Sequence, residues 1–205
     1  GTTDYSDLED ADLVIEAVFE NPEIKYEVFR TLDEVCKPGA ILASNTSYQD
    51  VDAIAAVTAR PQDVLGMHFF SPANVMKLLE VVRGEQTADD VLATVMALAK
   101  KIRKVAVLSR VCYGFIGNRL QFAMLREAWA IWASGAASAE AIDTVVKSSF
   151  GRRVGITGPI ESADAGGLYT MYHFGKSLMP HLDTSPEPAA AIADRDRAAG
   201  WPIYR

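Results

Sequence analysis

The chain has 205 residues, of which 49% are hydrophobic and 23% are charged, so it can bury a sizeable core in one large domain or in a domain with an appendage. A net charge of −7 with scattered lysines and arginines argues against nucleic acid as the partner. Its apolar runs are far shorter than the roughly 20 residues that cross a bilayer, and it opens on no basic, apolar leader, so we expect no membrane span and a cytoplasmic location.

The first half of the chain alternates strand and helix patterns. Residues 12–19 form a short, nearly continuous apolar run rich in β-branched side chains, which is typical of a strand covered on both faces of a parallel sheet. Asn21 and Pro22 then begin an amphipathic helix, which the Pro-Gly pair at positions 38 and 39 ends. Strand, short-helix and strand patterns follow at residues 40–44, 48–57 and 64–70.

This β-α-β-α-β order predicts a parallel sheet with right-handed crossovers, whose carboxyl strand ends collect ligands. A further strand at residues 76–82 follows after a brief loop. Thr87 and Asp90 fit a capping box that opens a helix through Lys101, and residues 105–108 form a last strand.

Only helical patterns recur after residue 110, at residues 114–133, 139–149 and 159–179, with a weak one at 189–199. The composition shift predicts two domains. We expect an α/β domain over residues 1–109, with an incomplete Rossmann-type parallel sheet, followed by an all-α domain over residues 110–205.

One histidine and one carboxylate are the first candidates for chemistry. His68 and Glu80 are separated by an almost wholly apolar stretch, and His68 lies where a predicted strand leaves the sheet. A returning strand would bring Glu80 within hydrogen-bond reach, which suits a general base and its supporting carboxylate. A structural histidine beside aromatic residues, with Glu80 at a sheet edge, is the alternative.

Three other segments have both a functional and a structural interpretation. Ser47 follows a strand end, where it can contact a ligand, yet with Asp50 it also fits a helix cap. Asn118 follows a Gly-x-x-Gly helix start that is common in ordinary helices. Glu20 and Lys25 can hold ribose hydroxyls and phosphate at a strand's carboxyl end, or form a solvated surface pair. The two cysteines, Cys36 and Cys112, have no metal or redox spacing, and we expect no metal site.

Five ordered blocks between residues 4 and 170 together resemble the 3-hydroxyacyl-CoA dehydrogenase family. They are Asp12-Leu-Val-Ile-Glu-Ala-Val, Ala43-Ser-Asn-Thr-Ser47, His68-Phe-Phe-Ser-Pro, Val75-Met-Lys-Leu-Leu-Glu80-Val-Val and Gly114-Phe-Ile-Gly-Asn118-Arg119. The resemblance implies an NAD-binding Rossmann domain, a helical domain that carries much of a homodimer contact, and an acyl-CoA substrate in fatty-acid or short-chain acyl-CoA metabolism.

The resemblance also implies a role for individual residues. His68 takes the proton of the substrate's 3-hydroxyl while hydride leaves C3 for NAD, and Glu80 orients and supports the imidazolium. Ser47 and Asn118 hold the substrate's oxygen atoms. The cofactor is lined by Ala17, Glu20, Lys25, Asn45, Ser47 and Ser71, and many relatives have asparagine at the position of Ser71.

The family's opening strand, glycine-rich turn and helix are not found in these residues, so we expect the chain to be a fragment of a longer polypeptide that contains them. The family's typical ending is also replaced, by residues 200–205. Two alternatives to the acyl-CoA dehydrogenase remain. The first is a non-catalytic dimerising or acyl-CoA-binding module. The second is a related dehydrogenase that acts on a free hydroxy acid or on carnitine.

Overall fold

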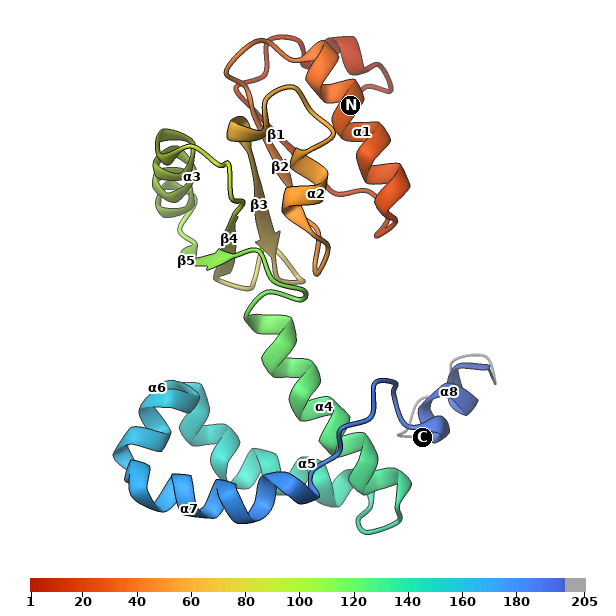
Figure 1. The fold of residues 1–205 in the computed structure, drawn as a ribbon, viewed down its shortest axis with the longest axis vertical. Helices are drawn as coiled ribbons and strands as arrows, with labels where there is room; N and C mark the ends of the chain where they lie inside the picture. The colour runs from red at the N-terminus through yellow and green to blue at the C-terminus, as the bar shows by residue number, and fades with distance from the viewer. Residues whose placement is uncertain (198–205) are drawn as a thin grey trace. The chain divides into compact units, whose positions relative to one another are not determined.

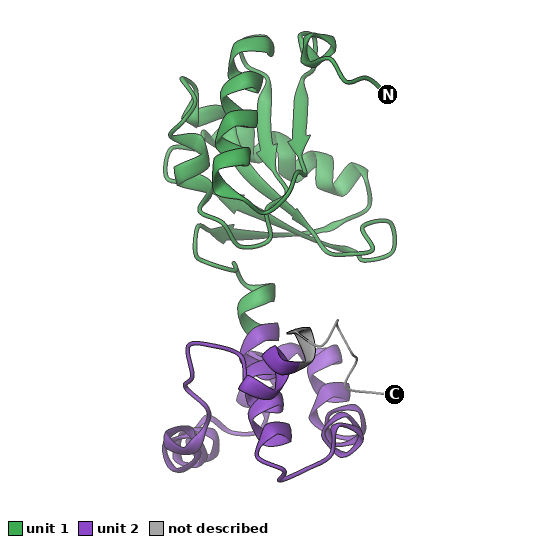
Figure 2. Ribbon diagram, turned by 90° about the vertical axis from the view of Figure 1, so that its right-hand side faces the viewer, with its two compact units in different colours: residues 1–120 green, residues 121–205 purple. Residues whose placement is uncertain are grey.

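A computed structural model describes residues 1–197, which fall into two compact units (Figure 2). The first unit is Gly1–Leu120, and the second begins at Gln121. The predicted α/β region followed by an all-helical region is confirmed. The weak helix predicted at residues 189–199 is α8, Ala190–Arg197, and its last two predicted positions lie outside the described residues.

The first unit contains one sheet of five strands in the order β1-β2-β3-β4-β5. The strands are β1 (Leu13–Glu16), β2 (Ile41–Ser44), β3 (Val64–Phe69), β4 (Leu78–Arg83) and β5 (Val105–Arg110). The pairs β1–β2, β2–β3 and β4–β5 are parallel.

The predicted parallel pairing of the first three strands is confirmed, and the returning strand expected for Glu80 is β4, which is antiparallel to β3. The connection between them spans residues 70–77, which is shorter than the dozen or more residues that a parallel crossover needs. The chain therefore turns back beside β3, and His68 and Glu80 become direct register partners.

Helices cover both faces of this sheet (Figure 1). The first face is covered by α1 (Pro22–Val35) and α2 (Val51–Ala55), and the opposite face by α3 (Asp89–Lys101). Phe29 and Leu32 of α1 are fully or almost fully buried against β2 and β3, and each contributes on the order of 1.5–3 kcal/mol to stability. This burial on two faces explains the continuous apolar patterns of β2 and β3.

The expected residue caps α1, whereas α2 and α3 do not begin at the residues expected to cap them. Asn21 caps α1 through its side chain, as predicted. The predicted cap by Ser47 is wrong, because Asp50 caps α2 by accepting from the amides of Asp52 and Ala53. The capping box at Thr87 is also wrong: its hydroxyl turns inward and donates to the carbonyl of Val64.

The helical region consists of α4 (Gly117–Ala133), α5 (Ala139–Ser148), α6 (Phe150–Ala165), α7 (Leu168–Leu178) and α8. Single turns of 3-10 helix occur at Tyr5–Leu8, Pro61–Asp63 and Met179–His181. The predicted helix at 159–179 is two helices, because Gly167 has a φ of 89° between α6 and α7, and α6 is itself kinked at Gly158. Within residues 1–197, no helix combines the length and apolarity needed to cross a membrane.

Candidate active site

His68 and Glu80 form a buried pair at the centre of the sheet. They are register partners on β3 and β4, so their side chains project from the same face. Nδ1 of His68 lies 2.7 Å from Oε2 of Glu80, and the two side chains are 5% and 1% exposed. The sequence therefore placed both members of this pair correctly.

Two further donors hold the Glu80 carboxylate in its ionised form. Its Oε1 accepts hydrogen bonds from the backbone amides of Ile116 (3.1 Å) and Gly117 (2.8 Å), where α4 begins. Burial raises the pKa of Glu80, but the hydrogen bonds from His68 and these amides outweigh burial and lower the pKa below its ordinary value. Because an ionised carboxylate only accepts, Nδ1 carries the hydrogen and Nε2 of a neutral imidazole is left as the basic atom.

Aromatic rings enclose the imidazole. The rings of Phe70 and Phe115 lie 4.6 and 5.7 Å from it, measured between centroids. Phe115 has a φ of 48°, which is unusual for a bulky residue, and it is buried against Val51 and Val82. Gly117 allows the close approach of Phe70, because a Cβ at position 117 would lie 2.4 Å from the ring's Cζ.

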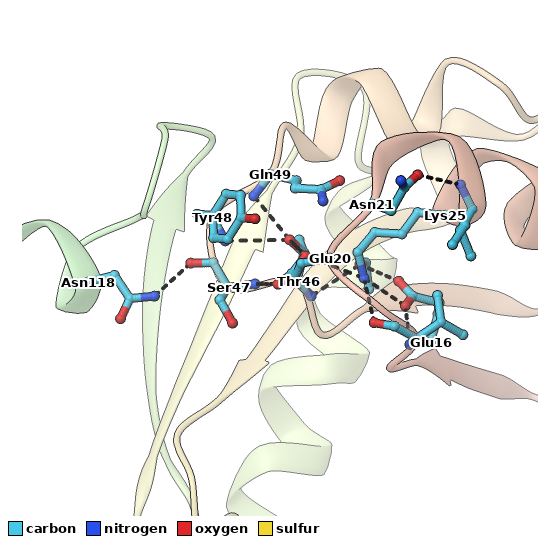
Figure 3. Close-up of polar contacts among 12 residues, drawn as sticks. Glu16, Glu20, Asn21, Lys25, Thr46, Ser47, Tyr48, Gln49 and Asn118 are labelled. Carbon is cyan, nitrogen blue, oxygen red and sulfur yellow. Dashed lines mark hydrogen bonds and ion pairs between the residues drawn. The ribbon is translucent and has the colours of Figure 1, made fainter. Parts of the chain in front are cut away.

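Ser47 is held by its backbone, from two sides (Figure 3). Its amide donates to Oε1 of Glu20, and its carbonyl accepts a hydrogen bond of 2.8 Å from Nδ2 of Asn118. Its hydroxyl has no hydrogen-bond partner among residues 1–197. Gly117 and Asn118 are consecutive, so the first turn of α4 contacts both Glu80 and the Ser47 loop.

Lys25 lies at the centre of a charged cluster with Glu16, which is buried, and Glu20, whose side chain is 29% exposed. Its Nζ is 2.8 Å from Oε1 of Glu16 and 3.6 Å from Oε2 of Glu20, and its side chain is 1% exposed. The interpretation of Glu20 and Lys25 as a solvated surface pair is therefore wrong. Sequence reasoning also missed Glu16, although a carboxylate inside an otherwise apolar strand is a signal of a buried, paired charge.

Of the remaining cofactor candidates, Asn45 takes part in a hydrogen bond of the site, whereas Ala17 and Ser71 do not. Asn45 connects two strand ends, because its Oδ1 accepts a hydrogen bond of 2.9 Å from the amide of Phe69. Ala17 and Ser71 are exposed beyond the ends of β1 and β3, and neither side chain joins the network in the part of the chain that the structure describes. In the same part of the chain, no three His, Cys, Asp or Glu side chains gather as metal ligands.

These groups lie at or near the carboxyl ends of β1, β2 and β3 and at the start of α4. They combine a buried base that a carboxylate orients, an uncommitted hydroxyl and an amide side chain. That set can remove a proton from a substrate hydroxyl while other groups hold its oxygen atoms.

Comparison with known proteins points to one family. Residues 1–112 match the NAD-binding domain of 3-hydroxyacyl-CoA dehydrogenase, and residues 114–199 match the C-terminal domain. A probable 3-hydroxybutyryl-CoA dehydrogenase of Bacillus subtilis (strain 168) is 43% identical over 95% of this chain and 67% of its own length. The peroxisomal bifunctional enzyme of Danio rerio is 48% identical over 79% of this chain.

A solved structure is similar over nearly the whole chain. It is 5-formyl-3-hydroxy-2-methylpyridine 4-carboxylic acid 5-dehydrogenase, an NAD⁺-dependent dismutase, with 32% identity and a TM-score of 0.91 over 97% of this chain. This chain spans only part of each relative: 67% of the bacterial protein, 65% of the solved structure and 22% of the bifunctional enzyme.

Proposed function

Because the chain belongs to the 3-hydroxyacyl-CoA dehydrogenase family, we propose that the protein oxidises a (3S)-3-hydroxyacyl-CoA to the 3-oxoacyl-CoA with NAD as hydride acceptor. The observation that carries this proposal is the buried His68–Glu80 pair, with 2.7 Å between Nδ1 and Oε2. The names of the bacterial relatives support an acyl-CoA substrate, and we place the reaction in fatty-acid or short-chain acyl-CoA metabolism.

In the proposed reaction, Nε2 of His68 accepts the proton of the 3-hydroxyl. The oxygen's electron pair then forms the carbonyl as the hydrogen on C3 departs as hydride. The Glu80 carboxylate stabilises the resulting imidazolium, and because the backbone amides at the start of α4 fix its other oxygen, it needs little reorganisation. In the reverse reaction, the imidazolium returns the proton to the carbonyl oxygen.

Ser47 and Asn118 are proposed to hold the substrate's oxygen atoms. The hydroxyl of Ser47 is available because the contacts that fix this residue use its backbone. Asn118 uses one hydrogen of Nδ2 on the Ser47 carbonyl, which leaves its second hydrogen as a donor. Two donors near one base suit a substrate oxygen that gains negative charge as its proton leaves.

The carboxyl ends of β1 and β2 fit part of a dinucleotide site, which in open α/β sheets lies at this edge. Residues 17–19 leave β1 as an exposed segment, and the amide of Asn45 bonds to the carbonyl of Glu16, so the two segments adjoin. When bound, NAD supplies the hydride acceptor. We propose that Ala17, Asn45, Ser47 and Ser71 face it, and that Glu20 and Lys25 support the same edge.

The full-length protein tests this function directly. With acetoacetyl-CoA and NADH we expect loss of NADH absorbance, and His68→Gln should remove most turnover while circular dichroism stays unchanged. General base catalysis is worth about 10²- to 10⁴-fold, which sets the expected loss. His181→Gln, at an exposed position of the helical unit, is the matched control. Undiminished activity of His68→Gln would sink the assignment.

A second substrate class has its own support. The solved relative with a TM-score of 0.91 is named as a dehydrogenase of a pyridine carboxylic acid, so the same chemistry on a free hydroxy acid, or on carnitine, is the alternative. Comparing kcat/KM for 3-hydroxybutyryl-CoA, 3-hydroxybutyrate and carnitine separates these classes. A non-catalytic module predicts no turnover of any of them and, by calorimetry, no binding of NAD.

We also propose a homodimer formed through the helical unit, in a cytoplasmic protein. Its helices α6 and α7 expose large apolar side chains, including Ile156 at 86%, Ile160 at 82% and Tyr169 at 78%. Apolar surface of this extent favours burial against a partner. Light scattering after size exclusion should give twice the subunit mass, and Ile160→Asp should lower it. A monomeric wild-type protein would contradict the dimer.

A further inference from the structure

The cluster of buried Glu16 and Lys25 with partly exposed Glu20 is not explained by the proton transfer itself. Lys25 Nζ donates hydrogen bonds to Oε1 of Glu16 at 2.8 Å and to the carbonyl of Val18 at 3.3 Å. It also forms an ion pair with Oε2 of Glu20, at 3.6 Å. The Lys25 side chain is 1% exposed, which leaves it no surface for a ligand.

Stability alone is a weak reason for such a cluster. Two carboxylates share one ammonium, and the desolvation cost of buried charges offsets much of their attraction. An apolar set of similar volume would stabilise the same region equally well or better. Buried ionic groups are more readily explained where they fix a particular local geometry.

Both carboxylates fix the loop that carries Ser47 (Figure 3). Oε2 of Glu16 accepts from the Ser44 hydroxyl at 2.7 Å, and that hydroxyl in turn accepts from the amide of Thr46 at 3.2 Å. Glu20 accepts from the Thr46 hydroxyl at 2.9 Å and from the Ser47 amide. Two routes thus run from Lys25 to Thr46 and Ser47.

We propose that Glu16 and Lys25 are positioning residues: their buried ion pair holds the 44–47 segment so that the Ser47 hydroxyl keeps one orientation at the reacting oxygen. Lys25 holds both carboxylates in place, and Glu16 transmits the constraint through Ser44. Neither residue touches the substrate. This inference rests on the proposed function, in which Ser47 contacts the substrate.

The test uses Lys25→Met and Glu16→Gln in the full-length protein, with Lys37→Met as the matched control. Lys37 also forms an ion pair, 2.7 Å from Asp12, but that pair is exposed and its Asp12 precedes β1, whereas Glu16 ends β1. Misplacing a catalytic group by about 1 Å costs roughly 10²-fold, so we expect kcat to fall by up to about that factor in the cluster variants and to change little in the control. If Lys25→Met does not fold, the isosteric Glu16→Gln decides alone.

Two readouts separate positioning from the other roles. Because the Lys25 side chain is 1% exposed and its ammonium is hydrogen-bonded to Glu16 and to the Val18 carbonyl, Lys25→Met should leave the calorimetric Kd for NAD within about threefold of wild type. In a Ser47→Ala background, Lys25→Met and Glu16→Gln should cost little further kcat, because residues that act through one another are not additive. A merely structural role would lower Tm and would act equally in both backgrounds.

The kcat values and the Kd for NAD of these variants distinguish a failure of the positioning role from a failure of the proposed function. If Ser47→Ala keeps full activity, the proposed function's site is wrong. If Ser47→Ala is impaired but Glu16→Gln retains wild-type kcat, the positioning role is overturned while the proposed function stands. If the Kd for NAD rises as much as kcat falls in Lys25→Met, then Lys25 contacts the cofactor and the inference is also overturned.

Discussion

Replacing Glu80 by glutamine changes one atom of the His68–Glu80 pair and gives the sharpest test of its chemistry. Glu80 accepts from three donors: Nδ1 of His68 and the amides of Ile116 and Gly117. A glutamine has one acceptor oxygen and one NH₂ group, so it cannot satisfy all three. The side chain must choose between the imidazole and the start of α4.

The number of buried donors left unpaired decides which way the introduced glutamine side chain is oriented. With its oxygen toward His68, the introduced glutamine would face two backbone amides with its own NH₂, and each unpaired buried amide costs about 1–3 kcal/mol. With its oxygen on those amides, the NH₂ faces His68, and the ring needs only to move its hydrogen from Nδ1 to Nε2. We expect this second arrangement. It removes the basic Nε2, so kcat should fall by about 10²- to 10⁴-fold, the share that a positioned general base supplies.

Initial rates of NADH consumption measure this loss, and ¹⁵N chemical shifts of the imidazole report which nitrogen carries the hydrogen. The unfolding free energy should fall by only about 1–2 kcal/mol, the difference between hydrogen bonds to charged and to neutral acceptors. Glu85→Gln is the control, because Glu85 is exposed just beyond β4. A Glu80→Gln protein whose kcat stays within about threefold of wild type, less than 1 kcal/mol of barrier, would refute this reasoning.

Three further predictions concern stability. Gly117→Ala places a Cβ 2.4 Å from Phe70 and should cost about 1–3 kcal/mol in urea denaturation. Gly155→Ala should cost nothing, because among the described residues its Cβ would meet no atom within 4 Å outside its own stretch of helix, and equal effects would contradict the contact. Gln49 is 6% exposed, and its Nε2 has no hydrogen-bond partner among the described residues. Gln49→Leu should therefore keep or raise the unfolding free energy. A loss above about 1 kcal/mol would be inconsistent with an unpaired amide. The pKa of Glu80 in the folded protein is lowered from 4.5, so the stabilisation by its ionised carboxylate is present above pH 4.5 and is lost as the pH falls through the lowered pKa. The unfolding free energy should therefore fall more steeply on acidification in wild type than in Glu80→Gln. Parallel curves for the two proteins would argue against this contribution of Glu80.

The His68–Glu80 pair could be predicted because short-range rules determine it. The two residues lie on adjacent strands, the connection is too short for a crossover, and alternation along a strand puts register partners on one face. The helix α1 was predictable for the same reason, since Asn21, Pro22 and the Pro-Gly pair act locally. The wrong caps at Ser47 and Thr87 show the limit: a buried carbonyl competed for the Thr87 hydroxyl, and no nearby sequence signal reports that.

The charged cluster could not be predicted from spacing. Glu16, Lys25 and Ser44 come from β1, α1 and β2, and only the packing of α1 on the sheet brings them together. The pair Glu20 and Lys25 looked exposed because both residues flank a helix start, where polar residues usually meet solvent. The structure shows instead that the Lys25 side chain is 1% exposed and that its Nζ contacts Glu16 at the end of β1.

The hydrogen bonds around the site form one connected network, and this connection determines how the effects of two substitutions in the site should combine. His68 is held by Glu80, Glu80 by Gly117, and Asn118 next to it by the carbonyl of Ser47, whose amide is held by Glu20. Every member lies within the first compact unit, so the helical unit need not move for them to be coupled. A substitution that removes one of these hydrogen bonds also changes the geometry of the neighbouring hydrogen bond. We therefore expect Glu80→Gln combined with Asn118→Ala to lower kcat/KM by less than the product of the single effects, and a multiplicative result would mean that the two contacts act independently.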